Sequence, residues 1–269
     1  MTSRATQLLQ PPDKDALWRL YHENSKVNLL DAHPSDASVV LRMQASAESL
    51  EFRGYAIVPL PEPKQLLMAL SDVISRRASA RAFTKDSISQ IELSTLLFCS
   101  CGISRGNSGT DFPRPFRVAP SGGALYPLEV FVYCARVVGL DAGLYHFNPV
   151  NPAFRLIDSS ENFGRTLTES FIQQELAESA AVIVMMCAFF DRSTFKYGER
   201  GYRFIMLEAG HMAQNICLAA TGLSLSCVPV GGFLDRKIDT LLSVDGISQS
   251  VVYTACIGGP RRGDHEKSD

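Results

Sequence analysis

The stretch at residues 202–221, YRFIMLEAGHMAQNICLAAT, decides the fold of this chain. It contains no proline and many good helix formers, and its apolar residues lie nearly all round a helical wheel. Such a pattern predicts a helix that is buried on every side. The small residues Ala209, Gly210 and Ala213 would let another helix approach closely. This helix is therefore either the centre of a core or part of a subunit interface.

The sequence around this helix predicts a domain of mixed helices and strands. Residues 180–190 form an apolar run with the length of a buried strand or of the end of a buried helix, and of the two we expect a strand. Ser89-Gln90-Ile91-Glu92 is a capping box at the start of a helix whose leucines share one face. Further strands are predicted at 128–137, 224–234 and 250–257, and a further helix at 64–76.

Three prolines mark the expected start of the compact domain. Pro59, Pro61 and Pro63 exclude a helix interior and favour an extended spacer. We therefore expect residues 1–62 to form an N-terminal arm with a short helix at 15–22 and this spacer. Residues 63–269 are expected to form one domain.

The composition is that of a folded, water-soluble protein, with 46% hydrophobic and 20% charged residues among 269. The net charge of -2 gives no basic surface for DNA or RNA. The longest uncharged stretch, 209–234, is interrupted by polar residues, and no secretory apolar run lies near residue 1, so neither a membrane span nor export is expected. Seven cysteines scattered through apolar segments favour reduced thiols in the cytoplasm.

Three arginines and a serine lie close together in the segment 76–83, RRASARAF. Guanidinium groups offer forked donors that match phosphate oxygens, and a serine hydroxyl adds another donor. Arg77, Ser79 and Arg81 are therefore candidate phosphate ligands. A solvated helix end, where cations meet the helix dipole, is the simpler explanation of these residues alone.

Two pairs of glycines could let backbone amides approach a ligand closely. An ordinary turn and an ordinary strand end explain them as well, and neither pair matches a Walker loop or a dinucleotide fingerprint. The residues concerned are Pro120, Ser121, Gly122 and Gly123 before the strand at 128–137, and Val230, Gly231 and Gly232 near the end of the strand at 224–234.

The segment 196–202, KYGERGY, gathers functional side chains ahead of the long helix. Lys196 and Tyr197 have free pKa values of about 10, so either could exchange a proton only in a site that lowers its pKa. The alternative for this segment is a surface turn.

Metal sites receive little support from the sequence. Glu208 and His211 have the Glu-x-x-His spacing of di-iron bundles, but such sites need a second copy of the motif and further carboxylates. We expect the two side chains to satisfy each other or a partner helix. Cys99 and Cys101 lack the spacing and the partner pair of a zinc site. No metal is predicted.

Taken in order along the chain, these motifs resemble the nitroreductase-like flavoproteins, and specifically the SagB-type (McbC-like) azoline dehydrogenases. The resemblance covers about residues 60–259. It rests on Arg77-x-Ser79-x-Arg81-x-Phe83, Pro120-Ser-Gly-Gly-Ala-Leu-Tyr-Pro-Leu-Glu129, Gly143-Leu-Tyr-His-Phe-Asn-Pro149, Lys196-Tyr197, Tyr202-Arg-Phe204, Glu208-Ala-Gly-His-Met-Ala-Gln-Asn215 and Pro229-Val-Gly-Gly-Phe233.

The resemblance implies an α+β fold with a central, mainly antiparallel sheet flanked by helices. It also implies an intertwined homodimer with FMN at the subunit interface. In that arrangement Lys196 and Tyr197 are the catalytic proton-transfer groups. The implied FMN ligands are Arg77, Ser79 and Arg81 with Arg261 or Arg262 at the phosphate, Pro120, Ser121, Gly122 and Gly123 along the ribityl chain or ring, and Val230, Gly231 and Gly232 at the N5 edge.

Two departures from plain nitroreductases bear on the reaction. Ala78 precedes Ser79 in place of a second arginine, and Tyr126-Pro127 stands where those proteins have Gln-Pro-Trp. The second departure, with Lys196-Tyr197, favours FMN-dependent oxidation of a thiazoline or oxazoline ring to the aromatic azole. The azoline would lie in a ribosomal peptide or in a peptide tethered to a carrier protein.

The expected partners are a second copy of the chain and the azoline-containing peptide, with a cyclodehydratase or a peptidyl carrier protein as further candidates. Two other functions stay open from the sequence. One is an NAD(P)H-dependent nitro- or quinone-reductase on the same fold. The other is a scaffold subunit without catalytic activity.

Overall fold

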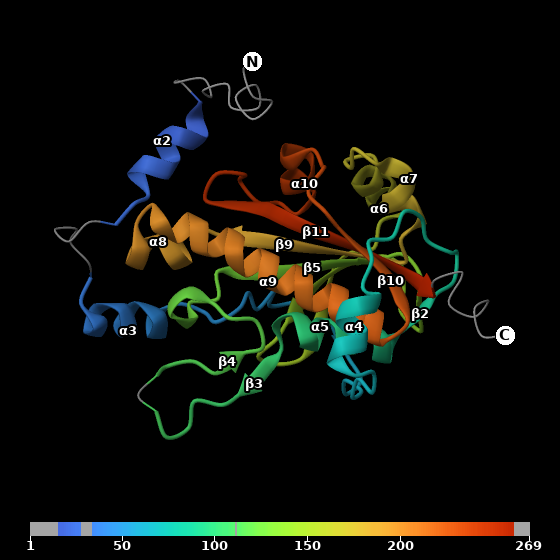
Figure 1. Ribbon diagram of the computed structural model, residues 1–269, viewed down its shortest axis with the longest axis horizontal. Coiled ribbons are helices and arrows are strands. Elements are labelled where there is room, and N and C mark those ends of the chain that lie inside the picture. The colour runs from blue at the N-terminus through green and yellow to red at the C-terminus, as the bar shows by residue number, and fades with distance from the viewer. Residues whose placement is uncertain (1–15, 28–33, 111, 261–269) are drawn as a thin grey trace, which may run out of the picture.

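The computed structural model describes residues 16–27, 34–110 and 112–260, and a seven-stranded sheet lies at its centre (Figure 1). Neighbouring strands in this sheet are antiparallel throughout. The predicted central antiparallel sheet is therefore confirmed. The order across the sheet is β1 (Ile57–Pro59), β8 (Ala153–Asp158), β7 (Gly143–Asn148), β5 (Leu128–Cys134), β9 (Val182–Phe189), β11 (Gln249–Pro260) and β10 (Leu225–Val230).

Two short strand pairs stand beside this sheet in the described part of the chain. One pairs β2 (Ile88–Ser89) with β6 (Val137–Val138) in parallel. The other pairs β3 (Ile103–Arg105) with β4 (Phe116–Arg117) antiparallel, at the base of the loop that leads into β5.

Helices cover both faces of the sheet, which gives three layers (Figure 1). The helices α5 (Gln90–Cys101) and α9 (Arg200–Gly222) pack on one face, against Val184 and Met186 of β9. The other face is covered by α6 (Glu161–Thr168), α7 (Gln174–Ser179) and α10 (Asp235–Leu241), which pack against Ile183 and Met185. Because both faces of β9 are covered, its eight residues are all buried and all apolar, which explains the apolar run in the sequence.

The main predicted elements are confirmed. The stretch 202–221 lies within α9, and the run at 180–190 contains β9. Ser89 accepts the N–H of Glu92 at 3.3 Å while the Glu92 carboxylate accepts the N–H of Ser89 at 2.7 Å, so the capping box forms at the start of α5. The predicted short N-terminal helix is α2 (Leu17–Asn24), and the three other predicted strands overlap β5, β10 and β11.

The helix predicted at 64–76 is too long. Only α4 (Leu70–Arg76) is helical there. The preceding segment is instead fastened to α5, because Ser94 donates a hydrogen bond to the Pro61 carbonyl at 2.6 Å and Lys64 donates its N–H to Thr95 at 3.0 Å. These tertiary contacts outweigh the local helix preference of the sequence.

The segment before residue 63 contains two elements that the sequence did not reveal. The helix α3 (Asp36–Ala45) buries Val39 and Met43, and β1 adds an edge strand to the main sheet beside β8. The division of the chain at residue 62 stays a prediction. The contacts show that residues 36–59 pack on the rest of the chain.

The long helix α9 has one exposed side. Tyr202 is 42% exposed and Leu207 is 59% exposed, and Gly210 and His211 also face outward. The expectation that this helix is buried on every side is therefore wrong for a single chain. No helix in the described part of the chain is long and apolar enough to span a membrane.

We predict that Ile183→Ala lowers the free energy of unfolding by about 2–5 kcal/mol, because it leaves a cavity between β9 and the helices α6, α7 and α10. The matched control is Ile247→Ala, the same change at a side chain that is 86% exposed. It should alter stability by no more than about 0.5 kcal/mol. Denaturant unfolding followed by circular dichroism measures both, and equal losses would contradict the layered core.

Candidate active site

The loop between β4 and β5 has a strained backbone. Gly123, Ala124 and Tyr126 have φ angles of 63°, 49° and 49°. Residues other than glycine rarely adopt this left-handed conformation, so neighbouring groups must hold it in place. Tyr126 Oη accepts the N–H of Arg117 at 2.9 Å, and Ser121 Oγ accepts the N–H of Tyr126 at 3.0 Å. These two hydrogen bonds fix the loop from within.

The helix α8 (Asp191–Tyr197) ends at the two predicted catalytic residues, and both reach the same glycine. Gly198, with φ of 53°, stops α8 and turns the chain towards α9. A Cβ added to Gly123 would lie 2.6 Å from Tyr197 Oη and 3.2 Å from Lys196 Nζ. The Lys196 ammonium also lies 5.3 Å from the centre of the Tyr197 ring. A hydroxyl and an ammonium group therefore converge at one point of the loop, where only glycine fits.

The first turns of α9 complete this cluster. The ring of Phe204 packs edge-on against Tyr197, with the ring centres 4.9 Å apart. A Cβ added to Gly122 would lie 3.1 Å from the Phe204 ring, so this glycine also permits a close approach. The structure thus brings the predicted loop residues Ser121, Gly122 and Gly123 together with the predicted catalytic pair. Pro120 precedes them at an exposed position.

A cleft of about 510 Å³ borders the turn between α8 and α9. Lys196 and Tyr197 line it, together with the end of α2. The hydroxyl of Tyr21 donates to the carbonyl of Glu199 at 3.2 Å, and Arg203 donates to a carbonyl of α2 at 2.7 Å. These contacts hold α2 against the start of α9, so the end of α2 forms one side of the cleft.

The predicted phosphate ligands form a second group, beside β10. Ser79 and Cys227 form a short parallel bridge, in which Ala80 donates its N–H to the Cys227 carbonyl at 3.0 Å. Arg77 is half-buried, whereas Ser79 and Arg81 are exposed. Among the described residues neither arginine forms an ion pair with a carboxylate. Both guanidinium groups can therefore bind an external anion.

The second glycine pair lies at the end of the same strand. Val230 is the last residue of β10, and Gly231 and Gly232 follow it at exposed positions. The Gly232 carbonyl accepts the N–H of Ile172 at 2.9 Å, which ties this strand end to the region between α6 and α7. Arg261 and Arg262 lie outside the described residues, so their role at a phosphate stays a prediction.

The two groups lie at opposite ends of α9 within one chain. Phe204 marks the end next to the glycine loop, and Cys217, whose Sγ lies 3.9 Å from that of Cys227, marks the end next to β10. The 13 positions from 204 to 217 span about 20 Å at the rise of an α-helix. Within one chain, the glycine loop and the predicted phosphate ligands therefore lie beside opposite ends of this helix.

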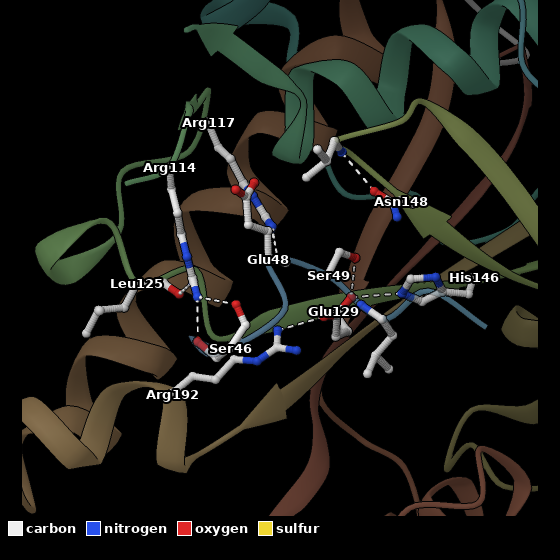
Figure 2. A network of polar contacts seen from close by, with 12 residues as sticks. Ser46, Glu48, Ser49, Arg114, Arg117, Leu125, Glu129, His146, Asn148 and Arg192 are labelled. Atoms are coloured by element: carbon white, nitrogen blue, oxygen red, sulfur yellow. Dashed lines mark hydrogen bonds and ion pairs between the residues drawn. The ribbon is translucent and has the colours of Figure 1, made fainter. Parts of the chain in front are cut away.

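Glu129 is a buried hydrogen-bonding centre directly after the loop (Figure 2). Its carboxylate accepts hydrogen bonds from the Ser49 hydroxyl at 2.8 Å, the Leu50 N–H at 3.0 Å, Arg192 at 2.6 Å and His146 Nε2 at 2.8 Å. Burial alone would raise the pKa of this carboxyl. The hydrogen bond from His146 and the charge of Arg192 outweigh burial and hold the pKa at about 2.

This ionisation has two structural consequences. An ionised carboxylate can only accept hydrogen bonds, so His146 must carry its proton on Nε2. Arg192 belongs to α8, so the ion pair with Glu129 fixes the helix that ends at the predicted catalytic residues.

Two arginines near this loop bind the N-terminal segment (Figure 2). The buried Arg114 donates to the carbonyls of Met43 and Ser46, at 2.9 and 3.2 Å, at the end of α3. Arg117 donates to the Glu48 carbonyl at 2.8 Å. Backbone carbonyls that the end of α3 leaves without helical partners are thereby satisfied. Residues 43–50 are therefore anchored to the loop and to β5.

Several of these roles could not be read from the sequence. Glu129 is a charged residue inside an apolar strand, and this position alone indicates a buried, paired carboxylate, because such a group is buried only when it has a partner. Nothing in the sequence marks Arg192 as its partner. Glu208 and His211 do not pair with each other in the chain, since Glu208 is buried and His211 is exposed. The alternative, a contact with a partner helix, stays a prediction.

A family model described as "Nitroreductase family" matches residues 74–259. The chain therefore belongs to the nitroreductase family, a family of oxidoreductases. It is 35% identical over 188 residues to the nitroreductase-family protein MJ1384 of Methanocaldococcus jannaschii, which covers 70% of this chain and 89% of that protein. It is 30% identical over 136 residues to the microcin B17-processing protein McbC of Escherichia coli, which covers 49% of each chain.

Solved structures agree with this assignment. A nitroreductase-like protein of Anabaena variabilis matches with a TM-score of 0.71 and 25% identity over 91% of this chain, which spans 47% of that larger chain. A chain in the McbBCD microcin synthetase complex of Escherichia coli, solved with truncated pro-MccB17 bound, matches with a TM-score of 0.60 and 23% identity over 91% of this chain and 92% of that chain. The predicted resemblance and the nitroreductase-like fold are confirmed.

We predict that Glu129→Gln lowers the free energy of unfolding by about 3 kcal/mol at pH 7, because it leaves the guanidinium of Arg192 without its buried counter-charge. The folded-state pKa of about 2 lies below the ordinary value of 4.5, so the stabilisation is complete above pH 4.5 and is lost as the pH falls towards 2.

Denaturant unfolding of wild type and Glu129→Gln at several pH values from 7 to 3 tests this prediction. The difference between the two proteins should shrink below pH 4.5. Glu175→Gln, at an exposed position of α7, is the matched control and should equal wild type throughout. A difference that does not change with pH would contradict an ionised Glu129.

Proposed function

We propose that this protein is an FMN-dependent oxidoreductase that dehydrogenates a thiazoline or oxazoline ring in a peptide to the thiazole or oxazole. The observation that carries the proposal is the convergence of Lys196 Nζ and Tyr197 Oη on Gly123. The reaction needs a proton acceptor held at a defined point beside a redox cofactor. Two proton-transfer groups at the surface of a glycine loop meet that requirement.

The residues present suit FMN. Arg77 and Arg81 are cations without an ion pair among the described residues, beside the exposed hydroxyl-bearing Ser79, and this donor set matches a phosphate. They would hold the phosphate, with Arg261 or Arg262 as further candidates. The ring and ribityl chain would contact Pro120, Ser121, Gly122 and Gly123 in the loop, and Val230, Gly231 and Gly232 at the end of β10.

Aromatisation removes two electrons and two hydrogens from the azoline ring, one hydrogen as a hydride and one as a proton. When bound, FMN supplies the two-electron acceptor for the hydride. The single proton goes to one member of the pair Lys196 and Tyr197, which accepts it in its deprotonated form, and general-base help of this kind is typically worth about 10²- to 10⁴-fold in rate. Phe204 and Gly122 pack closely at the same point and hold the Tyr197 ring in place.

We also propose that the active unit is a homodimer. The glycine loop and the phosphate group lie at opposite ends of α9, about 20 Å apart by helix rise. In a dimer, the loop of one protomer can meet the phosphate group of its partner. The exposed apolar side of α9, with Tyr202 and Leu207, is the surface that we assign to this contact.

The names of two relatives support a peptide substrate. The matches include the microcin B17-processing protein McbC and, at 27% identity over 38% of its length, the trifolitoxin-processing protein TfxB of Rhizobium leguminosarum. We include three further points in this proposal. The chain processes a peptide, it does so in the cytoplasm, and its partner is a cyclodehydratase or a peptidyl carrier protein.

The anaerobic visible spectrum of the FMN-loaded protein tests the function. Addition of a thiazoline-containing peptide should bleach the flavin in wild type. Lys196→Ala and Tyr197→Phe should retain the yellow cofactor and bleach about 10²- to 10⁴-fold more slowly, because the proton acceptor is lost. Full rates in both variants would contradict the catalytic assignment, and no bleaching of wild type by any azoline peptide would contradict the function.

A second candidate is an NAD(P)H-dependent nitro- or quinone-reductase. The match to MJ1384, with 35% identity and the largest coverage of this chain among the three curated relatives, favours it. A parallel anaerobic cuvette with NADPH separates the two functions. Bleaching by NADPH and not by the peptide would replace the oxidase by the reductase.

The phosphate site has its own test. Arg77→Ala and Arg81→Ala should each weaken FMN binding by about tenfold or more, because each removes a charged hydrogen-bond donor to the phosphate. Arg236→Ala, at an exposed position of α10, is the matched control and should bind FMN as wild type does. Titration of FMN fluorescence measures all three. Unchanged binding in both site variants would place the phosphate elsewhere.

A further inference from the structure

The helix α3 packs on both sides of the candidate reaction site. Val39 and Met43 of α3 are each 3% exposed, and they form a small apolar core with Leu125 of the glycine loop, which we call the α3 core. Phe195 and Tyr197 of α8 pack against the same core. One helix of the N-terminal segment therefore joins the glycine loop to the helix that carries the predicted catalytic pair, and it lies beside that helix (Figure 1).

The outer side of α3 also contacts α8, but more weakly. The guanidinium of Arg42 lies 4.6 Å from the centre of the Phe195 ring, and its Nη2 lies 3.5 Å from a carboxylate oxygen of Asp191. The two side chains of this ion pair are 55% and 72% exposed, and ion pairs in water contribute little to stability. The position of α3 must therefore be fixed by its buried contacts.

A single buried guanidinium fastens the end of α3 to the glycine loop (Figure 2). Arg114 is 4% exposed, and its Nη2 donates to the carbonyls of Met43 and Ser46, at 2.9 and 3.2 Å, and to Ser46 Oγ at 2.7 Å. Its Nη1 donates to the Leu125 carbonyl at 3.2 Å. The last carbonyls of a helix lack helical partners and carry the negative end of its dipole, so they suit a cation.

These acceptors are what compensates the burial of Arg114. Among the described residues no carboxylate forms an ion pair with it. A buried cation is costly unless its donors are satisfied, so the guanidinium keeps the end of α3 and the loop backbone at a fixed separation. Loss of either acceptor group would leave donors unsatisfied in the interior.

The bond to Leu125 falls on the strained part of the loop. Ala124 and Tyr126, on either side of Leu125, both have φ angles of 49°, and such backbone persists only where its surroundings determine it. The Leu125 side chain is 1% exposed in the α3 core, and its carbonyl is bound by Arg114. Gly123, where the predicted catalytic pair meets the loop, lies only two residues away.

We propose that Arg114 is a positioning residue, which binds the end of α3 to the loop and so sets Gly123 and Tyr197 against each other. The inference rests on the proposed function, because it takes the loop and α8 as the reaction site. The donors of Arg114 are directed at α3 and the loop backbone, so it acts through Leu125 and the α3 core. The helix that it holds lies before residues 74–259, which the family model matches.

Arg114→Met tests the proposal, because methionine is also long and unbranched but donates no hydrogen bond. The kcat of the FMN-loaded protein should fall by about tenfold to a hundredfold, the scale of a misplacement of about 1 Å, while the KM for the thiazoline peptide stays unchanged. An unchanged kcat would overturn the proposal.

Arg136→Met is the matched control. Arg136 also donates to a backbone carbonyl, that of Ser179 at 2.7 Å, but it follows the end of β5 that is farther from the loop. This variant loses a contact of the same kind and should keep the kcat of wild type. An equal loss of kcat in Arg136→Met and Arg114→Met would show general destabilisation and would overturn the positioning role.

Hydrogen exchange of the FMN-free protein, followed by mass spectrometry, tests the geometry without any substrate. In Arg114→Met the amides of 36–50, 121–127 and 191–197 should exchange faster by about tenfold or more, the effect of one lost charged hydrogen bond on local opening. Arg136→Met should leave these three segments as they are in wild type. Faster exchange in 36–50 alone would show that α3 is merely docked, and would overturn the proposal.

Met43→Ala provides a second variant in case Arg114→Met does not fold. It keeps the backbone carbonyl that Arg114 binds and shortens a side chain of the α3 core. It should also speed exchange in 121–127 and 191–197 and lower kcat with the KM unchanged, whereas wild-type exchange in both segments would overturn the proposal. Because the exchange experiment needs neither flavin nor azoline, it decides the role of Arg114 even if the proposed function fails.

Discussion

The ion pair between Glu129 and Arg192 is the interaction on which the candidate site depends. Desolvation of a carboxylate costs several kcal/mol, and only a complete set of partners offsets that cost. Glu129 has such a set, with a hydroxyl, a backbone N–H, an imidazole and a guanidinium around one carboxylate. Removal of any partner would leave charge or hydrogen-bonding capacity unsatisfied in the core.

The four partners of Glu129 come from separate parts of the chain. Ser49 and Leu50 belong to the segment after α3, His146 to β7 and Arg192 to α8, while Glu129 itself lies on β5. One carboxylate therefore couples the central sheet, the N-terminal segment and the helix that presents Lys196 and Tyr197. The placement of Lys196 and Tyr197 opposite Gly123 therefore depends on Glu129, which contacts neither of them and is far from both in the sequence.

The parts of the fold with strong local signals could be predicted from the sequence. The capping box of α5 is a local sequence motif, and the apolar patterns of the helix α9 and the strand β9 follow directly from burial. The helix predicted at 64–76 was too long because hydrogen bonds from Ser94 to Pro61 and from Lys64 to Thr95 fasten the chain before α4 to α5. The elements α3 and β1 depend on contacts with distant residues, chiefly Arg114 and β8, and such contacts leave no periodic pattern.

Some residues of the candidate site could likewise be predicted from the sequence, and others could not. Lys196, Tyr197 and the glycine loop could be selected because the resemblance supplied their roles, and the structure brings them together at Gly123. The role of Glu129 was not predictable, because it depends on which distant donors reach a buried carboxyl. Glu208 and His211 occupy neighbouring positions on their helix, but they do not pair with each other in the chain because tertiary packing buries only Glu208.

The geometry of α9 explains why one protomer holds two half-sites in the dimer that we propose. The helix is rigid, and its two ends contact the glycine loop and the strand β10 respectively. A straight helix of this length keeps the two groups apart, and in the proposed dimer a second copy brings one group of each kind to the same ligand. A two-fold arrangement that pairs the exposed sides of α9 would cover Tyr202 and Leu207 and form two equivalent sites. Gly210, where a Cβ would meet no neighbouring atom in the single chain, then marks where a partner helix can approach most closely.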